Sequence, residues 1–112
     1  MPLFSALDDH AMDSEKINKI EVLGTGELFL GLEGEGRPGY QHVYREAAGV
    51  YWDELRYGFK STPMKDWTCL QWYRQIVAAV RYIGVDLVLA DEVIWSGVPE
   101  DEKAEIQRDK TI

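Results

Sequence analysis

The chain has 112 residues and a formal net charge of −8, from 20 acidic and 12 basic side chains. This length allows one domain, and a hydrophobic fraction of 46% with 29% charged residues is typical of a globular protein. The acidic balance argues against nucleic acid or an anionic membrane as partner, because phosphate groups are bound by clustered Lys and Arg. The chain also has four Trp and six Tyr, and these aromatic side chains suit a binding surface.

The sequence shows no sign of export or of membrane insertion. The first 16 residues lack the basic segment and the continuous apolar stretch of a secretory signal. No run approaches the roughly 18 apolar residues that span a bilayer. The one cysteine, Cys69, cannot form an intramolecular disulfide. We therefore expect a cytoplasmic protein whose fold depends on its hydrophobic core.

Residues 1–16 are polar and acidic, and we expect an N-terminal arm there, either frayed or as a short helix. Residues 17–112 are expected to form a single α+β domain. Within it, Leu28, Leu30 and Leu32 alternate with other residues in the pattern of a half-buried strand. A glycine-rich turn at 34–39 precedes a second predicted strand at 40–47, and a third and a fourth are predicted within 50–59. Short turns join antiparallel neighbours, so we expect an antiparallel meander.

A helical pattern begins after residue 61. Thr62 is the predicted N-cap and Pro63 the first helical residue, and the helix is expected to end near Ile83 because Gly84 suits a left-handed C-cap. The apolar positions cover roughly half of the circumference, wider than the stripe of about 100° that a sheet-packed helix needs. This surplus indicates either burial between layers or a contact with another subunit.

Two further strands are predicted at residues 85–90 and 92–95, followed by a last helix at 100–110. Acids precede bases along that helix, as the helix dipole favours. Only Ala104 and Ile106 could be buried, so we expect it to be peripheral. The predicted fold class is α+β: an antiparallel β-meander packed by one long α-helix, with a further strand and a short C-terminal helix.

Cofactor and metal motifs are missing or out of context. Gly34, Gly36 and Gly39 match G-x-G-x-x-G, but a dinucleotide fingerprint must open a helix, and here a strand pattern follows. Glycines of a hairpin turn are the favoured interpretation. His10 has no metal-ligand spacing around it, and Cys69 is best explained as a small buried hydrophobe. We predict no cofactor and no metal site.

The aromatic segment from residue 40 to residue 57 gives the candidate site. If residues 40–47 form a strand, alternate side chains share one face, and the next strand adds aromatic and acidic groups beside them. Such a surface suits a small-molecule cleft or a protein-binding hot spot. Alternatively, these aromatics serve only as strand formers and cross-strand pairs. The predicted ligand- or partner-binding residues are Tyr40, His42, Tyr44, Glu46, Trp52 and Asp53.

Catalysis would need a general acid and a general base that converge on a substrate. His42, with Glu46, Asp53 or Glu54, could supply them. No catalytic motif accompanies these residues, so the prediction leans against an enzyme and assigns no catalytic residue.

Residues 36–99 resemble small bacterial proteins carried in accessory DNA. The resemblance lies in GRPGYQHVYREAAGVYWD (36–53), GFKSTPMKDWTCLQWYRQIV (58–77) and GVDLVLADEVIWSGVP (84–99). These segments are similar to integron gene-cassette proteins and to the small immunity proteins of polymorphic-toxin systems. The resemblance implies a compact cytoplasmic α+β domain, able to dimerise, whose role is binding. An acidic surface fits an immunity protein, since many toxin domains are basic nucleases.

The sequence supports two functional hypotheses. The first is a non-enzymatic binding protein of immunity type that neutralises a basic protein partner. The alternative is a small-ligand-binding protein or minor enzyme, with the predicted binding residues in a pocket between sheet and helix. The wide apolar arc of the helix also predicts a homodimer that buries Trp67 or Trp72 against a second copy.

Overall fold

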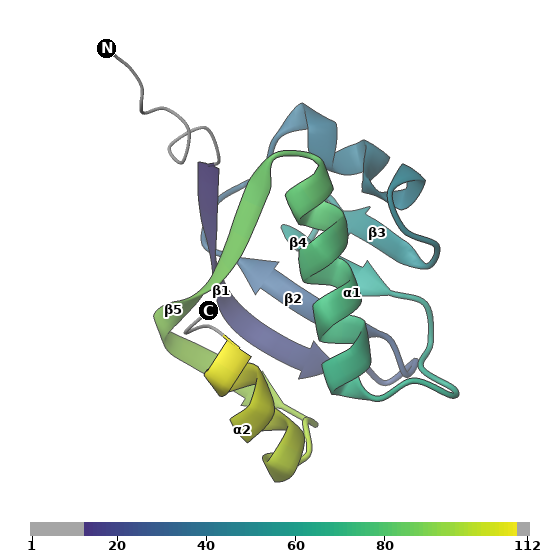
Figure 1. Cartoon of the computed structure of the whole chain (residues 1–112), viewed down its shortest axis with the longest axis vertical. Coiled ribbons are helices and arrows are strands. Elements are labelled where there is room, and N and C mark those ends of the chain that lie inside the picture. The colour runs from purple at the N-terminus through teal and green to yellow at the C-terminus, as the bar shows by residue number, and fades with distance from the viewer. Residues whose placement is uncertain (1–12, 110–112) are drawn as a thin grey trace.

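A computed structural model describes residues 13–109 and shows one five-stranded sheet with helices packed against it (Figure 1). The α+β class is therefore confirmed. In chain order the elements are β1 (Asp13–Val22), β2 (Leu28–Leu32), the 3-10 helix η2 (Pro38–Arg45), β3 (Val50–Asp53), β4 (Gly58–Ser61), α1 (Cys69–Tyr82), β5 (Val85–Ser96) and α2 (Glu100–Asp109).

The strands lie in the order β3-β4-β2-β1-β5. All neighbouring pairs are antiparallel except β1 and β5, which are parallel. β4 rather than β3 lies beside β2, so the strands do not follow one another across the sheet as in a simple meander. Parallel strands cannot be joined by a tight turn, and the chain between β1 and β5 includes α1.

The interior strand β1 is absent from the sequence prediction, and a bulge explains why. Ile17 and Ile20 are both fully buried, although residues at odd spacing in a regular strand point to opposite faces. The register against β2 shifts between Ile17 and Lys19, which makes Asn18 an extra residue. The bulge returns Ile20 to the face of Ile17. Residues 13–16, expected in the N-terminal arm, are the first residues of β1, and the rest of that arm lies outside the described residues.

Residues 38–45 form a 3-10 helix, and the strand predicted at 40–47 is wrong. Tyr40 and Val43 are both buried, and three residues per turn place them on one side of η2. The intervening Gln41 and His42 are exposed. Buried positions three apart, behind a proline at the start of the helix, distinguish this segment from a strand.

Helix α1 begins later than predicted, and Thr68 rather than Thr62 is its N-cap. Thr68 Oγ1 accepts a hydrogen bond from the Gln71 N–H (3.2 Å), and Gln71 Oε1 accepts one from the Thr68 N–H (2.8 Å). This is a reciprocal capping box. The Thr62 N–H instead donates to the Gly49 carbonyl (2.9 Å). The C-terminal end is as predicted, since Gly84 follows the last turn with a φ of 93°.

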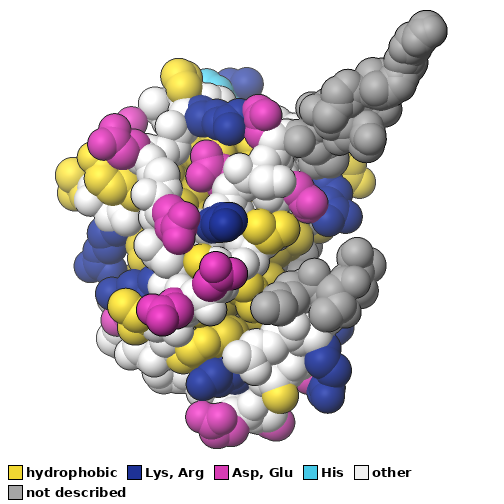
Figure 2. Space-filling view, turned by 90° about the vertical axis from the view of Figure 1, so that its left-hand side faces the viewer, with side chains coloured by type: hydrophobic (Ala, Val, Ile, Leu, Met, Phe, Trp, Pro, Cys, Tyr) yellow, Lys and Arg dark blue, Asp and Glu magenta, His cyan; other side chains and the backbone are white. Residues whose placement is uncertain are grey.

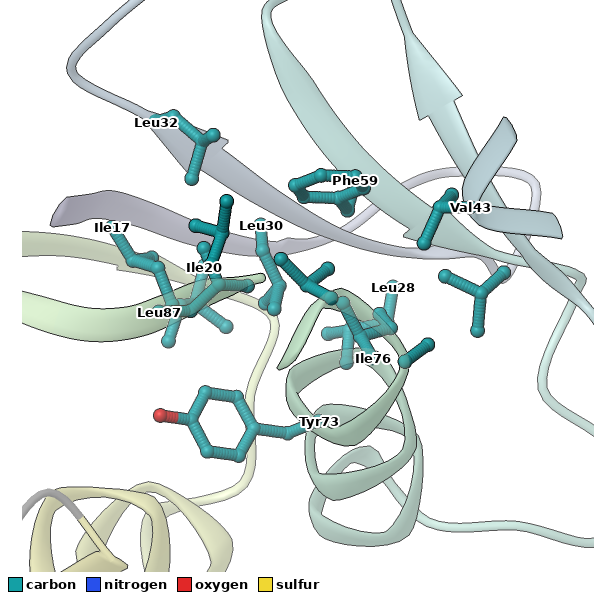
Figure 3. Close-up of a cluster of buried hydrophobic side chains, with 14 of the residues drawn as sticks. Ile17, Ile20, Leu28, Leu30, Leu32, Val43, Phe59, Tyr73, Ile76 and Leu87 are labelled. Atoms are coloured by element: carbon teal, nitrogen blue, oxygen red, sulfur yellow. The ribbon is translucent and has the colours of Figure 1, made fainter. Parts of the chain in front are cut away.

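The core lies between α1 and the sheet (Figure 3). In this view, Ile76 projects from α1 toward the side chains of β2, among them Leu28. Residues on the edges of the predicted apolar arc, such as Trp72 and Val77, are half-buried and pack against the core from the side. The fully buried members of the core are Ile17, Ile20, Leu28, Leu30, Val43, Val50, Phe59, Ile76, Val80 and Ile106.

Helix α2 is part of this core rather than peripheral. Ile106 is fully buried. The Glu102 carboxylate accepts a hydrogen bond from the Leu70 N–H (3.0 Å) in the first turn of α1, where backbone donors have no partner within the helix. The Arg74 guanidinium donates two hydrogen bonds to Asp109 (2.8 and 3.1 Å). The two helices are therefore joined near both ends of α2.

Replacing the observed N-cap should destabilise the protein more than replacing the predicted one. We expect Thr68→Ala to lower the free energy of unfolding by about 1 kcal/mol, because a side chain that caps backbone N–H groups is lost. Thr62→Ala is the matched control and should cost less than about 0.5 kcal/mol. Urea denaturation of both variants checks this. A larger loss for Thr62→Ala would contradict the position of the cap.

Candidate functional site

The predicted surface of Tyr, His and carboxylate groups is not formed by residues 40–47. In η2, the side chain of Tyr40 is buried in the core, whereas His42, Tyr44 and Glu46 are exposed. Because the helix has three residues per turn, these four side chains do not share one face. The predicted arrangement is therefore wrong, and its cause is the wrong secondary structure.

Tyr40 instead holds η2 to the sheet. Its ring lies 5.1 Å from that of Trp52 and 5.0 Å from that of Phe59, centroid to centroid. Its hydroxyl donates to a carboxylate oxygen of Glu15 in β1 (3.1 Å), and Arg37 also pairs with Glu15 (3.7 Å). Burial, and then the nearby Glu15 carboxylate, raise the pKa of Tyr40 well above its usual value. Tyr40 and Trp52 thus form a structural cluster.

Asp53 fixes the turn between β3 and β4. Its carboxylate accepts hydrogen bonds from the N–H groups of Leu55 (3.0 Å) and Arg56 (3.2 Å), and it pairs with Lys60 (3.7 Å). The Asp53 carboxylate therefore bonds to groups of its own hairpin.

The structure brings together a different pair of aromatic residues, Trp67 and Trp72. Their ring centroids are 4.8 Å apart, with an angle of 47° between the planes. Trp67 lies in the loop between β4 and α1 and is 43% exposed, and Trp72 lies in α1 and is half-buried. They border a hollow of about 600 Å³, which we call the tryptophan pocket, lined also by Ala48, Thr62, Pro63, Lys65, Asp66 and Gln75.

The turn before β3 is shaped around Trp72. Gly49 has a φ of 84°, and a Cβ atom there would lie 2.6 Å from a ring atom of Trp72. Glycine is therefore required both by the backbone conformation and by the space. Two backbone hydrogen bonds hold the loop that carries Trp67, from Thr62 to Gly49 (2.9 Å) and from Met64 to Gly26 (2.8 Å).

The polar groups of the tryptophan pocket differ in burial and in charge. Lys65 and Asp66 are exposed at the rim and carry opposite charges, and Thr62 and Gln75 are half-buried. The Nε1–H group of Trp72 is buried, and none of the described residues accepts a hydrogen bond from it. An unsatisfied buried donor costs about 1–3 kcal/mol. The pocket therefore offers an apolar lining and four polar side chains, and one of its lining residues carries an unsatisfied buried donor.

The sequence predicts Trp67 and Trp72 as interface residues but does not indicate the other residues of the pocket. The pattern at residues 63–68 predicts a helix, whereas the structure has a loop there. The signal that identifies the loop is the Thr-x-x-Gln pattern of the capping box, which starts the helix at residue 69. The predicted roles of both Trp residues in a subunit contact stay predictions.

Within residues 13–109, no group of three or more His, Cys, Asp and Glu side chains is arranged to hold a metal ion. Neither is any helix of this part of the chain long and apolar enough to cross a membrane. His10 lies outside the described residues. Cys69 is buried, as predicted, and burial followed by the charge of Glu102 raises the pKa of its thiol.

The raised pKa of Tyr40 predicts a loss of stability at alkaline pH. Above pH 10, the usual pKa of tyrosine, the unfolded chain loses this proton while the folded chain keeps it, so the free energy of unfolding falls as the pH rises. Tyr40→Phe should make this fall less steep. Urea denaturation between pH 8 and about 11 checks it, with Tyr82→Phe, whose ring is 78% exposed, as the control. Equal slopes for wild type and Tyr40→Phe would contradict the assignment.

Comparisons with known proteins agree on one family. Residues 20–93 match the family described as Integron Cassette Protein Hfx_Cass5. One solved structure, "Structure from the mobile metagenome of North West Arm Sewage Outfall: Integron Cassette Protein Hfx_Cass5", is 35% identical, and the alignment covers 90% of this chain and 99% of that one, with a TM-score of 0.40. No curated protein matches. The predicted resemblance to integron cassette proteins is confirmed: the chain belongs to the Hfx_Cass5 family.

Proposed function

We propose that this integron cassette protein is a binding protein whose tryptophan pocket takes a small molecule with a flat apolar ring. The observation that carries the proposal is the pair Trp67 and Trp72 beside a hollow of about 600 Å³, together with the unsatisfied buried Nε1–H of Trp72. Small-molecule sites are typically hollows of about 300–1,000 Å³ with apolar linings and a few polar groups. The proposal keeps the small-ligand hypothesis from the sequence but moves the site from residues 40–53 to the start of α1.

The two Trp side chains would play different parts in this binding. The exposed face of Trp67 offers a ring against which a flat ligand stacks. The Nε1–H of Trp72 offers a hydrogen bond to an acceptor on the ligand. Because this atom is buried, an acceptor would reach it only after a local rearrangement. Trp67, whose ring contacts that of Trp72, belongs to a loop rather than to a helix or strand.

The charges around the pocket favour neutral or cationic ligands. Lys65 and Asp66 balance one another at the rim. The net charge of −8 then gives the chain as a whole a negative potential, which lowers the local concentration of anions. A cation can also lie over the face of a Trp ring.

Three probes of similar size and different charge test the proposal: phenyltrimethylammonium, benzyl alcohol and benzoate. We expect the first two to shift the indole N–H resonance of Trp72 in NMR spectra and to bind more tightly than benzoate. If none of the three shifts this resonance, the proposed site is wrong.

Removing the exposed ring should weaken binding without unfolding the protein. We expect Trp67→Ala to weaken binding of the best probe about tenfold, equivalent to about 1.4 kcal/mol, because the stacking surface is lost. Tyr51→Ala is the matched control, since Tyr51 is also 43% exposed and lies on β3, outside the pocket. Unchanged affinity in Trp67→Ala would contradict the role of this ring.

The same variants test the predicted homodimer. We propose, as the alternative use of the pocket, that Trp67 and Trp72 pack against a second copy, since Trp72 lies on the edge of the apolar arc of α1 and the ring of Trp67 lies beside it. Light scattering would then show a dimer that Trp67→Ala dissociates. A monomer at high protein concentration removes the dimer and leaves the small-molecule proposal standing.

A second candidate function is neutralisation of a basic protein in a reducing cytoplasm, as an immunity protein does. Two facts support it: the net charge of −8 and a single cysteine that is free and buried. The surface in Figure 2 gives it less support, because acidic and basic side chains alternate there instead of forming an acidic face. Affinity capture from a bacterial lysate at low and high salt tests it. We expect a basic protein, captured only at low salt, that rebinds when purified; finding no salt-sensitive partner would count against this candidate.

A further inference from the structure

Strand β5 is at the edge of the sheet, and within residues 13–109 it pairs only with β1. An edge strand presents N–H and C=O groups that have no partner strand, and most proteins keep such strands short or cover them. β5 has 12 residues, more than twice the length of β2, β3 or β4. The first half of this strand therefore offers a template for another extended segment.

A hollow of about 520 Å³ lies beside this edge, between α1 and β5. Figure 1 shows α1 and the first part of β5 next to one another after the turn that joins them. The α1 residues that line this hollow recur at helical spacing along one side of the helix. Three consecutive residues of β5 line the other side of the hollow. We call this hollow the β5 groove; it is lined by Tyr73, Arg74, Val77, Ala78, Arg81, Asp86, Leu87, Val88 and Asp109.

The charged residues of the β5 groove are paired with one another. Arg74 donates to Asp109 (2.8 Å), and Arg81 donates to Asp86 (2.7 Å). The remaining lining is apolar apart from the hydroxyl of Tyr73. The groove therefore presents no net charge, and it matches a segment that is uncharged where it lies between α1 and β5.

We propose that the β5 groove binds an uncharged, extended segment of another polypeptide, which adds a strand beside β5. Backbone groups of the segment would pair with those of β5, and alternate side chains, on one face of the new strand, would enter the groove toward Val77 and Ala78. An extended polypeptide backbone can form hydrogen bonds with a row of unpaired N–H and C=O groups. The apolar lining then selects β-branched side chains, which favour strands.

A second copy of this chain is a poor occupant because of its charges. Antiparallel pairing of two β5 strands centred near Leu89 would place Asp86 of one copy opposite Asp91 or Glu92 of the other. Like charges directly opposite in a sheet are destabilising. Asp91 and Glu92 are exposed and so would meet the approaching strand.

This proposal is independent of the tryptophan pocket. The two hollows share no lining residue, and at about 100° per residue Arg81 lies on the side of α1 opposite Trp72. Failure of one site would therefore leave the other unaffected.

The probe is a labelled peptide, acetyl-Ser-Val-Thr-Val-Thr-Val-Ser-amide, added to the full chain. We expect it to slow amide hydrogen exchange in residues 85–89. The same peptide with all of its backbone amides N-methylated cannot donate to β5 and should bind at least tenfold more weakly. Equal binding of the two peptides, or unchanged exchange throughout β5, would overturn the proposal.

Two variants with the same added charge locate the site. Ala78→Arg places a long side chain in the groove at an exposed helical position, and we expect at least a tenfold loss of peptide affinity. Tyr82→Arg adds the same charge on an exposed residue outside the groove and should leave affinity unchanged. Equal losses of peptide affinity in the two variants would contradict the proposed position of the site. Slow exchange, in the free chain, of those β5 amides that do not donate to β1 would show that a terminal segment or a second copy already occupies the edge, and it would overturn the proposal as well.

Discussion

Ile17 and Ile20 are both fully buried below the helices, although they are three residues apart in one strand. With regular pairing, Ile20 would face outward, and exposing such a side chain costs about 1.5–3 kcal/mol. The extra residue at Asn18 prevents this. At the same point β5 shifts its register, since Ile17 pairs with Leu89 but Lys19 with Ile94. The bulge therefore divides β5 into a part beside α1 and a part whose Trp95 contacts Lys103 of α2 (5.4 Å from the ammonium nitrogen to the ring centroid).

The position of the α1 N-terminus determines whether the tryptophan pocket exists. The helix starts at Cys69 because Thr68 and Gln71 cap it from its own chain and Glu102 caps it from α2. Residues 62–68 consequently remain a loop, held by backbone hydrogen bonds to Gly49 and Gly26. A helix that began at Pro63 would include Trp67 in its second turn and remove one side of the hollow. The contacts that stabilise the start of this helix thus also shape the candidate site.

Local patterns predict the elements that local chemistry controls. The alternating leucines of β2, the glycine after α1 and the acid-first pattern of α2 each act within a few residues, and each of these elements is present in the structure. β2 is not half-buried as predicted, because all five of its residues are buried. The same local patterns do not predict η2 or the N-cap of α1 correctly. Tyr40 is a good strand former, but in the structure it packs against Trp52 and Phe59 from a 3-10 helix. Thr62 satisfies the N-cap rule, but Gly49 engages its N–H.

The candidate sites, too, could be predicted from local patterns only in part. The wide apolar arc of the predicted helix draws attention to Trp67 and Trp72, but it does not show the hollow beside them, because Gly49 and Thr62 come from other parts of the chain. Neither site is marked by the net charge of −8. Lys65 offsets Asp66 at the tryptophan pocket, and two ion pairs balance the β5 groove. The excess of acidic residues therefore lies outside both, and the aromatic and apolar sides of α1, rather than the charge, define where this protein can bind.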